Sequence, residues 1–112
     1  MIVDVLSATL TDAGRVPGAT PGSALTSELV LYEDGRTETG IWQVTPGGFD
    51  AFHGAYVEFM HFVAGEATIT TADGQVHEVR PGIALTVPSG WRARWEVRQT
   101  VRKTYVIVRD PR

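Results

Sequence analysis

His53 and Glu58 are the two residues whose side-chain types and spacing offer chemistry in this sequence. They stand in the segment AFHGAYVEFMHFVAG, residues 51–65, where His53 follows the predicted strand 49–51 and Glu58 lies in the predicted strand 57–63. Side chains alternate between the two faces of a strand, so His53 can share a face with Ala51, and Glu58 with Met60. We expect both faces to turn inward, so that the imidazole and the carboxylate converge and act as the candidate catalytic pair.

An imidazole and a carboxylate at one point would suit a divalent transition metal such as manganese, iron, nickel or zinc. A stable metal site usually has at least three protein ligands, and only His53 and Glu58 are available. His61 is three residues from Glu58 and therefore points to the opposite strand face, and we place His77 on an exposed strand. We expect a hydrogen-bonded His–Glu pair without a cofactor, and a metal bound by the pair is the alternative.

The acidity of Glu58 depends on its neighbours. Burial beside Met60 and Trp95 would raise the pKa of the Glu58 carboxyl, unless His53 or Lys103 pairs with it. A carboxyl with a raised pKa would be a candidate general acid or base. A paired carboxylate would instead be an ordinary salt bridge, and the sequence leaves both alternatives open.

A second set of side chains comes from the last two predicted strands. Trp95 shares a face with Ala93, and Lys103 shares a face with Tyr105. If both faces turn inward, they supply an aromatic wall, an ammonium and a phenol, which would suit a small anionic or amide-bearing ligand. Alternatively, Trp95 fills the core and Lys103 reaches the rim, whereas a buried Tyr105 hydroxyl needs a partner. With Met60, these three residues form the predicted ligand-binding set.

Strands must position all of these side chains. Short runs rich in β-branched and aromatic residues alternate with Gly and Pro turns, which is typical of an all-β sandwich or barrel. We predict strands over residues 28–32, 39–45, 49–51, 57–63, 66–71, 75–79, 83–87, 91–97 and 101–108. Residues 13–22 contain five Gly or Pro and are predicted to be a loop or arm. Residues 1–6 are predicted to form an edge strand, on this chain or on a partner.

The spacing of glycine, proline, histidine and glutamate resembles the two motifs of the cupin superfamily. The first motif reads G-x5-H-x-H-x(3–4)-E-x6-G, and its second half is matched by His53, Glu58 and Gly65. The second motif reads G-x5-P-x-G-x2-H-x3-N, and it begins in the stretch PGIALTVPSGW at residues 81–91, where Gly82, Pro88 and Gly90 match. The resemblance implies a small jelly-roll barrel, the cupin-type double-stranded β-helix.

The same motifs imply metal-ligand positions that this chain fills only in part. Ala51 stands where the first motif has its first histidine, and Ala93 stands where the second motif has its histidine. Val97 replaces the asparagine of the second motif. Of the four implied ligand positions, only His53 and Glu58 carry a coordinating side chain.

One branch of the superfamily is more similar than the rest. The segments GIWQVTPGGF, residues 40–49, and GWRARWEVRQTVRKTYVIV, residues 90–108, resemble the ureidoglycine aminohydrolase-type cupins over roughly residues 24–109. The residues that carry this resemblance are Gly40, Trp42, Trp95, Glu96, Val97, Val101, Arg102, Lys103 and Tyr105. It implies a manganese-dependent loss of ammonia from a ureide, in two-cupin chains with a fuller ligand set.

The composition and charge of the chain limit the kinds of cofactor and partner that it can have. The chain has 112 residues, a formal net charge of −3 and no cysteine, which excludes disulfides and thiolate metal sites. We expect one cupin domain over residues 24–112 after an arm or edge strand and loop at 1–23. Neither the charge nor any apolar run indicates a nucleic acid or a membrane as a partner, so we predict a cytoplasmic protein.

The sequence is compatible with three functions. The chain is predicted to bind a small polar molecule in the barrel, with a degenerate metal site. The first alternative is a metal-dependent enzyme, a hydrolase of ureides or amides, and the second is a structural dimer without chemistry. Outward-facing aromatic and histidine side chains would form the homodimer interface, because aromatics are enriched at interfaces; the candidates are Trp42, Phe52, Phe59 and His61.

Overall fold

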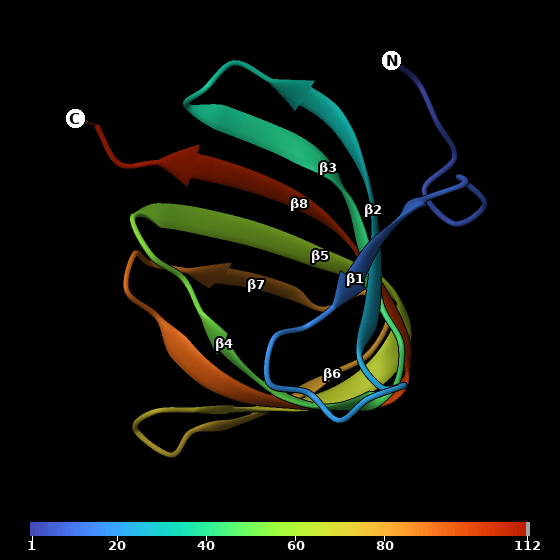
Figure 1. Ribbon diagram of the computed structural model, residues 1–112. Coiled ribbons are helices and arrows are strands. Elements are labelled where there is room, and N and C mark those ends of the chain that lie inside the picture. Colours follow the sequence, from blue (N-terminus) through green and yellow to red (C-terminus); the bar gives the residue numbers. More distant parts are fainter. Residues whose placement is uncertain (112) are drawn as a thin grey trace.

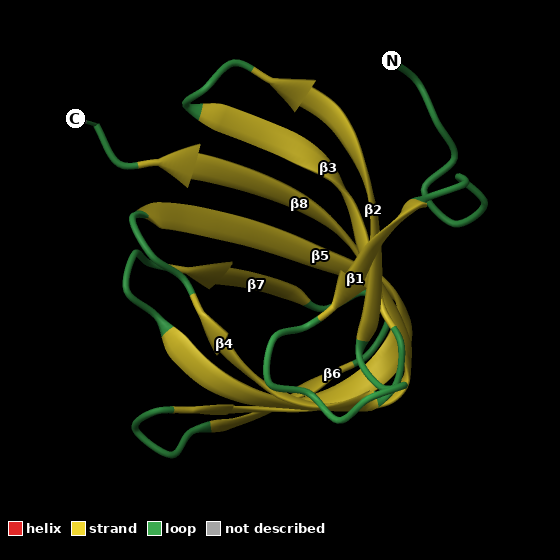
Figure 2. Ribbon diagram, viewed as in Figure 1, coloured by secondary structure: helices red, strands yellow, loops and turns green. Residues whose placement is uncertain are grey.

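The structure, a computed structural model that describes residues 1–111, consists of eight β-strands joined by turns and loops (Figure 1). No helix is drawn anywhere along these residues (Figure 2), so none of them forms a helix that could cross a membrane. The strands are β1 (Thr11–Arg15), β2 (Leu25–Glu33), β3 (Thr37–Val44), β4 (Gly47–Phe52), β5 (Tyr56–Thr71), β6 (Val76–Val79), β7 (Ala84–Val87) and β8 (Arg92–Arg109). The predicted all-β class is confirmed.

Two long strands, β5 and β8, run through the whole fold and pair with each other in an antiparallel manner. The first half of β8 also pairs with β4, and its second half pairs with β3. In the same way β5 pairs first with β7 and then with β6. Two sheets therefore share the bent strands β5 and β8 and curve around one interior, which is the jelly-roll barrel of a cupin (Figure 1).

The sequence predicted a break in each of these long strands, and the structure has a bend instead. The ladder between β5 and β8 shifts register around Ala64 and Glu66 but continues on both sides. Gly65 lies at the bend with φ +95°, and a β carbon there would overlap the Thr100 carbonyl oxygen and lie 2.6 Å from Val101 Cα. A glycine is needed at this point because the two strands approach too closely for any side chain.

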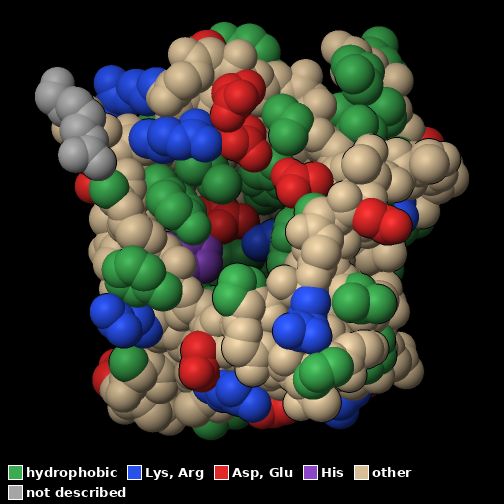
Figure 3. All heavy atoms as spheres, in the orientation of Figure 1, with side chains coloured by type: hydrophobic (Ala, Val, Ile, Leu, Met, Phe, Trp, Pro, Cys, Tyr) green, Lys and Arg blue, Asp and Glu red, His purple; other side chains and the backbone are tan. Residues whose placement is uncertain are grey.

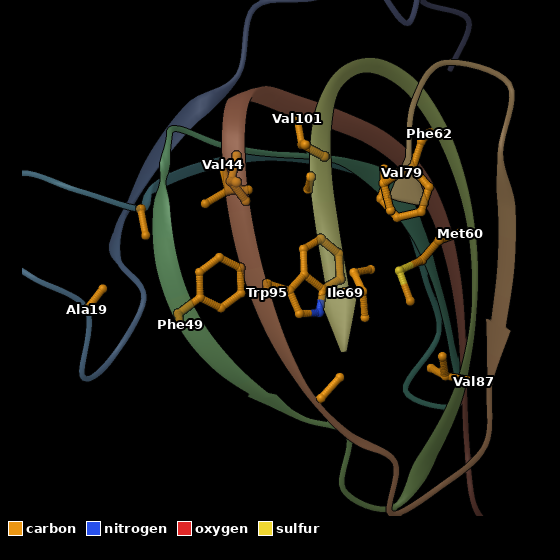
Figure 4. Close-up of a cluster of buried hydrophobic side chains, with 14 residues drawn as sticks. Ala19, Val44, Phe49, Met60, Phe62, Ile69, Val79, Val87, Trp95 and Val101 are labelled. Atoms are coloured by element: carbon orange, nitrogen blue, oxygen red, sulfur yellow. The ribbon is translucent and has the colours of Figure 1, made fainter. Parts of the chain in front are cut away.

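The core lies between the two sheets and is built from alternate residues of the bent strands. Along β8, Ala93, Trp95 and Val97 are buried while their neighbours are exposed. The Trp95 ring stacks on Phe49 at 5.6 Å and contacts Phe62 at 5.9 Å between ring centroids (Figure 4). Aromatic rings in such contacts bury large apolar areas, so Trp95 holds β8 against β4 and β5 in the core.

The N-terminal segment differs from its prediction. Residues 1–6 form no strand: residues 1–4 are irregular and a turn covers 5–7. The edge strand is β1, which pairs with β2 and includes the beginning of the predicted loop 13–22. The Arg102 guanidinium, on β8, donates hydrogen bonds to the carbonyl oxygens of Val5, Leu6 and Ala8. These bonds hold the N-terminal segment against the outer face of the sheet, where its backbone carbonyls are satisfied.

Candidate functional site

The candidate site is a chain of three buried polar side chains on the wall of the barrel. His53 Nε2 lies 2.7 Å from one Glu58 oxygen, and the Lys103 ammonium donates to the other oxygen at 2.7 Å. The three residues are only 6%, 4% and 6% exposed, respectively. His53 and Glu58 therefore meet inside the barrel as expected, and Lys103 turns inward to join them rather than reaching the rim.

Three elements bring these side chains together. Glu58 lies near the start of β5, and Lys103 lies on the neighbouring half of β8. His53 directly follows β4, where its N–H donates to the Trp91 carbonyl oxygen at 2.8 Å and its carbonyl oxygen accepts from Gly90 N–H at 2.6 Å. The turn between β7 and β8, rich in Pro and Gly, thus fixes the backbone of the candidate histidine.

The contacts among His53, Glu58 and Lys103 determine the charge state of Glu58. Burial tends to raise the pKa of Glu58, but the hydrogen bond from His53 and the charge and hydrogen bond of Lys103 outweigh it and hold the pKa below its usual value. The paired alternative for Glu58 is therefore the one observed. Because a carboxylate can only accept, His53 Nε2 carries the hydrogen of this bond. Nδ1 is buried and has no hydrogen-bond partner among residues 1–111.

The lysine is surrounded by electron-rich groups. Its ammonium lies 3.2 Å from Met60 Sδ, 4.6 Å from the centre of the Trp42 ring and 5.7 Å from that of Trp95. Burial lowers the pKa of Lys103, and the Glu58 carboxylate acts in the opposite direction. Aromatic faces attract a cation, so Trp42 and Trp95 support the charged form of Lys103 together with Glu58.

A second polar cluster lies beside the first. The Tyr105 hydroxyl donates to Glu38 at 2.7 Å, and the Arg109 guanidinium donates to the other Glu38 oxygen at 2.8 Å. The hydrogen bond from Tyr105 lowers the pKa of Glu38, burial opposes it, and Arg109 lowers it further. Burial and the bond to Glu38 raise the pKa of Tyr105, so the phenol stays protonated. The buried Tyr105 hydroxyl thus has the partner that its position requires.

Tyr105→Phe is expected to destabilise the protein by about 1.5 kcal/mol at pH 7, because it removes a hydrogen bond to a charged group. The depressed pKa of Glu38 means that this stabilisation is present above the unfolded pKa and disappears as the pH falls through the folded value. The difference between variant and wild type should therefore shrink below about pH 4. Urea unfolding between pH 3 and pH 7 measures it.

The matched control is Tyr32→Phe. The Tyr32 hydroxyl also donates to a carboxylate, Asp34, at 2.9 Å, but on the exposed surface. This variant should change the free energy of unfolding little at any pH. A loss in Tyr105→Phe that is as large at pH 3 as at pH 7 would show that the hydroxyl does not act through ionised Glu38.

Both clusters line one open cavity of about 500 Å³. In the space-filling view the cavity is a hollow in the molecular face, with acidic, basic and histidine side chains at its floor and hydrophobic groups around them (Figure 3). The residues that line it include Glu28, Glu38, Trp42, Phe49, His53, Tyr56, Glu58, Trp95, Lys103 and Tyr105. The volume is sufficient for a small organic molecule.

The structure places most of the predicted site residues in this cavity, with two differences. Met60 is fully buried and contacts the Lys103 ammonium through its sulfur, so it lies behind the wall. The predicted outward position of Trp42 is wrong, because its ring packs on Trp95 at 6.2 Å and lines the cavity. Phe59 and His61 are exposed on the outer face, where a role in a homodimer stays a prediction.

Several cavity residues escaped the sequence analysis, in particular Glu28, Glu38 and Tyr56. Glu28 pairs with Trp42 across β2 and β3, and Glu38 lies four residues before Trp42 on the same face. Had the inward face of residues 37–44 been known, both carboxylates could have been predicted. The Glu28 backbone is part of the strand ladder, but its carboxylate forms no hydrogen bond or ion pair with the residues that the structure describes.

The residues at the implied cupin metal positions do not fit a metal site. Across residues 1–111, no group of three or more His, Cys, Asp or Glu side chains is arranged to hold a metal ion. His61 and His77 are exposed and lie outside the cavity. His53 and Glu58 are bonded to each other, and Glu58 is also neutralised by Lys103. Two engaged side chains are fewer than a stable metal site requires.

A bent two-sheet barrel around an open cavity, with motif turns that position the cavity wall, defines a cupin. The chain belongs to the family of EutQ-like cupin domains, whose family model matches residues 31–105. Among curated proteins, none matches the sequence.

Solved structures with the same fold include two EutQ proteins. The EutQ protein of Clostridium difficile is 21% identical with a TM-score of 0.68, over 80% of this chain and 71% of that one. A putative ethanolamine utilization protein Q from Salmonella typhimurium is also 21% identical with a TM-score of 0.68, over 92% and 96% of the two chains. A DUF861 family protein from Thermotoga maritima is 34% identical with a TM-score of 0.54, over 58% and 73%. At these identities and coverages the similarities show the fold.

Proposed function

We propose that this cupin binds a small polar molecule in its barrel, and that the incomplete metal-ligand set plays no part in holding it. The observation that carries the proposal is the open cavity of about 500 Å³, whose wall combines aromatic rings with one buried and one partly buried hydrogen-bonded polar cluster. A mostly apolar cavity with a few convergent polar groups is the usual form of a small-molecule site.

The charges of the wall select the class of ligand. Lys103 is the only lysine or arginine among the described residues that line the cavity, and Glu58 neutralises it, so the wall offers no free cation to an anionic ligand. Glu28 lines the cavity and has no partner within residues 1–111. An uncharged amide or a cationic amine is therefore favoured over the anionic ligand that the sequence also allowed, because a carboxylate would face the unpaired Glu28.

The resemblance to ureidoglycine aminohydrolase-type cupins supports the amide class, since ureides carry several amide groups. From this resemblance we take only the class of ligand, amides such as ureides. The manganese-dependent reaction is not part of the proposal, because Ala51 and Ala93 stand at two of the metal-ligand positions. An acid–base enzyme is the second candidate. It is favoured by the His53–Glu58 pair, in which the carboxylate fixes the tautomer of the imidazole.

Three small molecules of one shape test the ligand class: isobutyramide, isobutylamine and isobutyrate. The amide and the amine are expected to raise the melting temperature saturably, whereas the carboxylate should not. A ligand at 100 times its Kd stabilises the folded state by about 2.7 kcal/mol. In a domain of this size that corresponds to a shift of roughly 10 °C or more. Thermal melting with rising ligand concentration is the measurement.

Glu28→Gln is the diagnostic variant, and Glu96→Gln, on the exposed face of β8, is its control. The first should lose most of the response to the amine and keep that to the amide, while the second should keep both. A response to isobutyrate alone would contradict the proposed charge preference. No saturable response to this set, nor to ureides, amino acids or sugars, would contradict ligand binding itself.

A further inference from the structure

At the metal-ligand positions of the cupin motifs, this chain has two alanines and a histidine–glutamate pair. Ala51 and Ala93 pair directly across β4 and β8, so two methyl groups face each other where the motifs have histidines. The two ligand-type residues that remain, His53 and Glu58, are buried and in contact. A carboxylate in this environment needs a counter-charge, because an isolated buried charge is costly.

Both oxygens of Glu58 are already occupied. Oε1 accepts from His53 Nε2 and Oε2 accepts from Lys103 Nζ, each at 2.7 Å. A zinc-like metal would lie about 2.0–2.2 Å from a carboxylate oxygen and about 2.0–2.1 Å from an imidazole nitrogen. Such an ion would displace the hydrogen between His53 and Glu58 and would stand beside the lysine ammonium, with like charges a few ångströms apart.

The surroundings of Lys103 are those of a bound cation. One carboxylate oxygen, the Met60 sulfur at 3.2 Å and the Trp42 ring at 4.6 Å approach the ammonium from different elements, β5 and β3. Lys103 itself is only 6% exposed. If a metal took over Glu58, the ammonium would keep only a thioether and aromatic faces, which do not compensate for a buried charge as a carboxylate does.

We infer that the Lys103 ammonium takes the place of the metal ion in this barrel and acts as a cation that the chain itself supplies. The barrel then keeps a fixed positive charge against Glu58 without any dependence on metal supply. Metal ions are kept out by occupation of the carboxylate as well as by the missing histidines. The inference concerns the wall of the cavity and holds whichever ligand the cavity takes.

The test is a titration of wild type and of Lys103→Met with Mn²⁺. Binding is measured from the decrease in the electron paramagnetic resonance signal of free Mn²⁺. Methionine keeps the unbranched apolar stem of lysine and removes the ammonium. Wild type is expected to show no Mn²⁺ binding that depends on His53. Lys103→Met should gain a weak two-ligand Mn²⁺ site with an affinity at least tenfold above any residual binding of wild type, and a further Glu58→Gln change should abolish the gain.

The outcomes separate clearly. A wild-type protein that binds one Mn²⁺ per chain, with an affinity that His53→Ala lowers, would overturn the inference. So would equal affinities of wild type and folded Lys103→Met, or a gain that survives Glu58→Gln. If Lys103→Met does not fold, the wild-type titration alone decides, since His53-dependent binding overturns the inference and its absence supports it. Failure of the amide and amine panel would affect the proposed function only.

Discussion

Glu58→Leu is expected to lower the free energy of unfolding by about 3–5 kcal/mol, because it leaves a buried ammonium without its counter-charge. Lys103 has no other carboxylate within hydrogen-bonding distance among the residues described, and it is 6% exposed. His53 Nε2 loses its acceptor at the same time. Since small domains are stable by only about 5–15 kcal/mol, this single change removes a large part of the total. Urea unfolding measures the loss.

A double-mutant cycle shows whether the loss comes from the ion pair. Lys103→Met alone should also destabilise, but the double variant Glu58→Leu/Lys103→Met should be more stable than Glu58→Leu, because neither charge is then left unpaired. The exposed pair Glu78–Arg98, joined at 2.9 Å, is the control and should show little coupling. Additive losses at Glu58 and Lys103 would mean that their charges do not interact in the folded protein.

Gly65→Ala is expected to destabilise the protein by about 3 kcal/mol or more, through backbone strain and overpacking together. The residue has φ +95°, and its β carbon would overlap the Thr100 carbonyl and lie 2.6 Å from Val101 Cα. Both neighbours are backbone atoms of β8 and cannot move aside as a flexible side chain could. The melting temperature should fall by at least about 12 °C in a domain of this size.

Gly82→Ala separates the two contributions to that loss. Gly82 has nearly the same dihedral angle, φ +97°, but its β carbon would meet nothing within 4 Å. This control should show only the conformational term, about 1–2 kcal/mol. If the two alanine variants lost the same stability, the close approach of β5 and β8 at Gly65 would not be a real constraint on the fold.

The motif turns were the most predictable part of the fold. The turns around β7 follow from the backbone preferences of three residues, Gly82, Pro88 and Gly90. The continuity of β5 and β8 was not predictable in the same way. A glycine at 65 and the polar residues 98–100 are typical of a turn, and only pairing with the other long strand keeps the chain extended there.

In the candidate site, too, features set by local sequence were predictable and features set by tertiary contacts were not. His53 and Glu58 were predicted to converge because strand alternation and spacing are local properties. The inward face of β3 was mispredicted because Ile41 and Trp42 are both large and apolar, so the pattern does not distinguish the faces. Ile41 is fully buried, and it lies on the strand face opposite Trp42.

Lys103 illustrates why partners are harder to predict than positions. From the sequence, a lysine on a strand can either reach the solvent or turn inward, and the two alternatives differ by the presence of a buried counter-charge. Glu58 lies 45 residues earlier in the chain, and the two meet only because β5 and β8 pair. Their contact gives the cavity wall a buried ion pair.

A crystal structure of the protein crystallised with manganese shows whether the Lys103 ammonium or a metal ion neutralises Glu58. We expect Lys103 Nζ to lie within hydrogen-bonding distance of Glu58 Oε2, close to 2.7 Å, with no anomalous scattering peak beside the carboxylate. A peak bound to both His53 and Glu58, with the Lys103 side chain turned away from them, would contradict it.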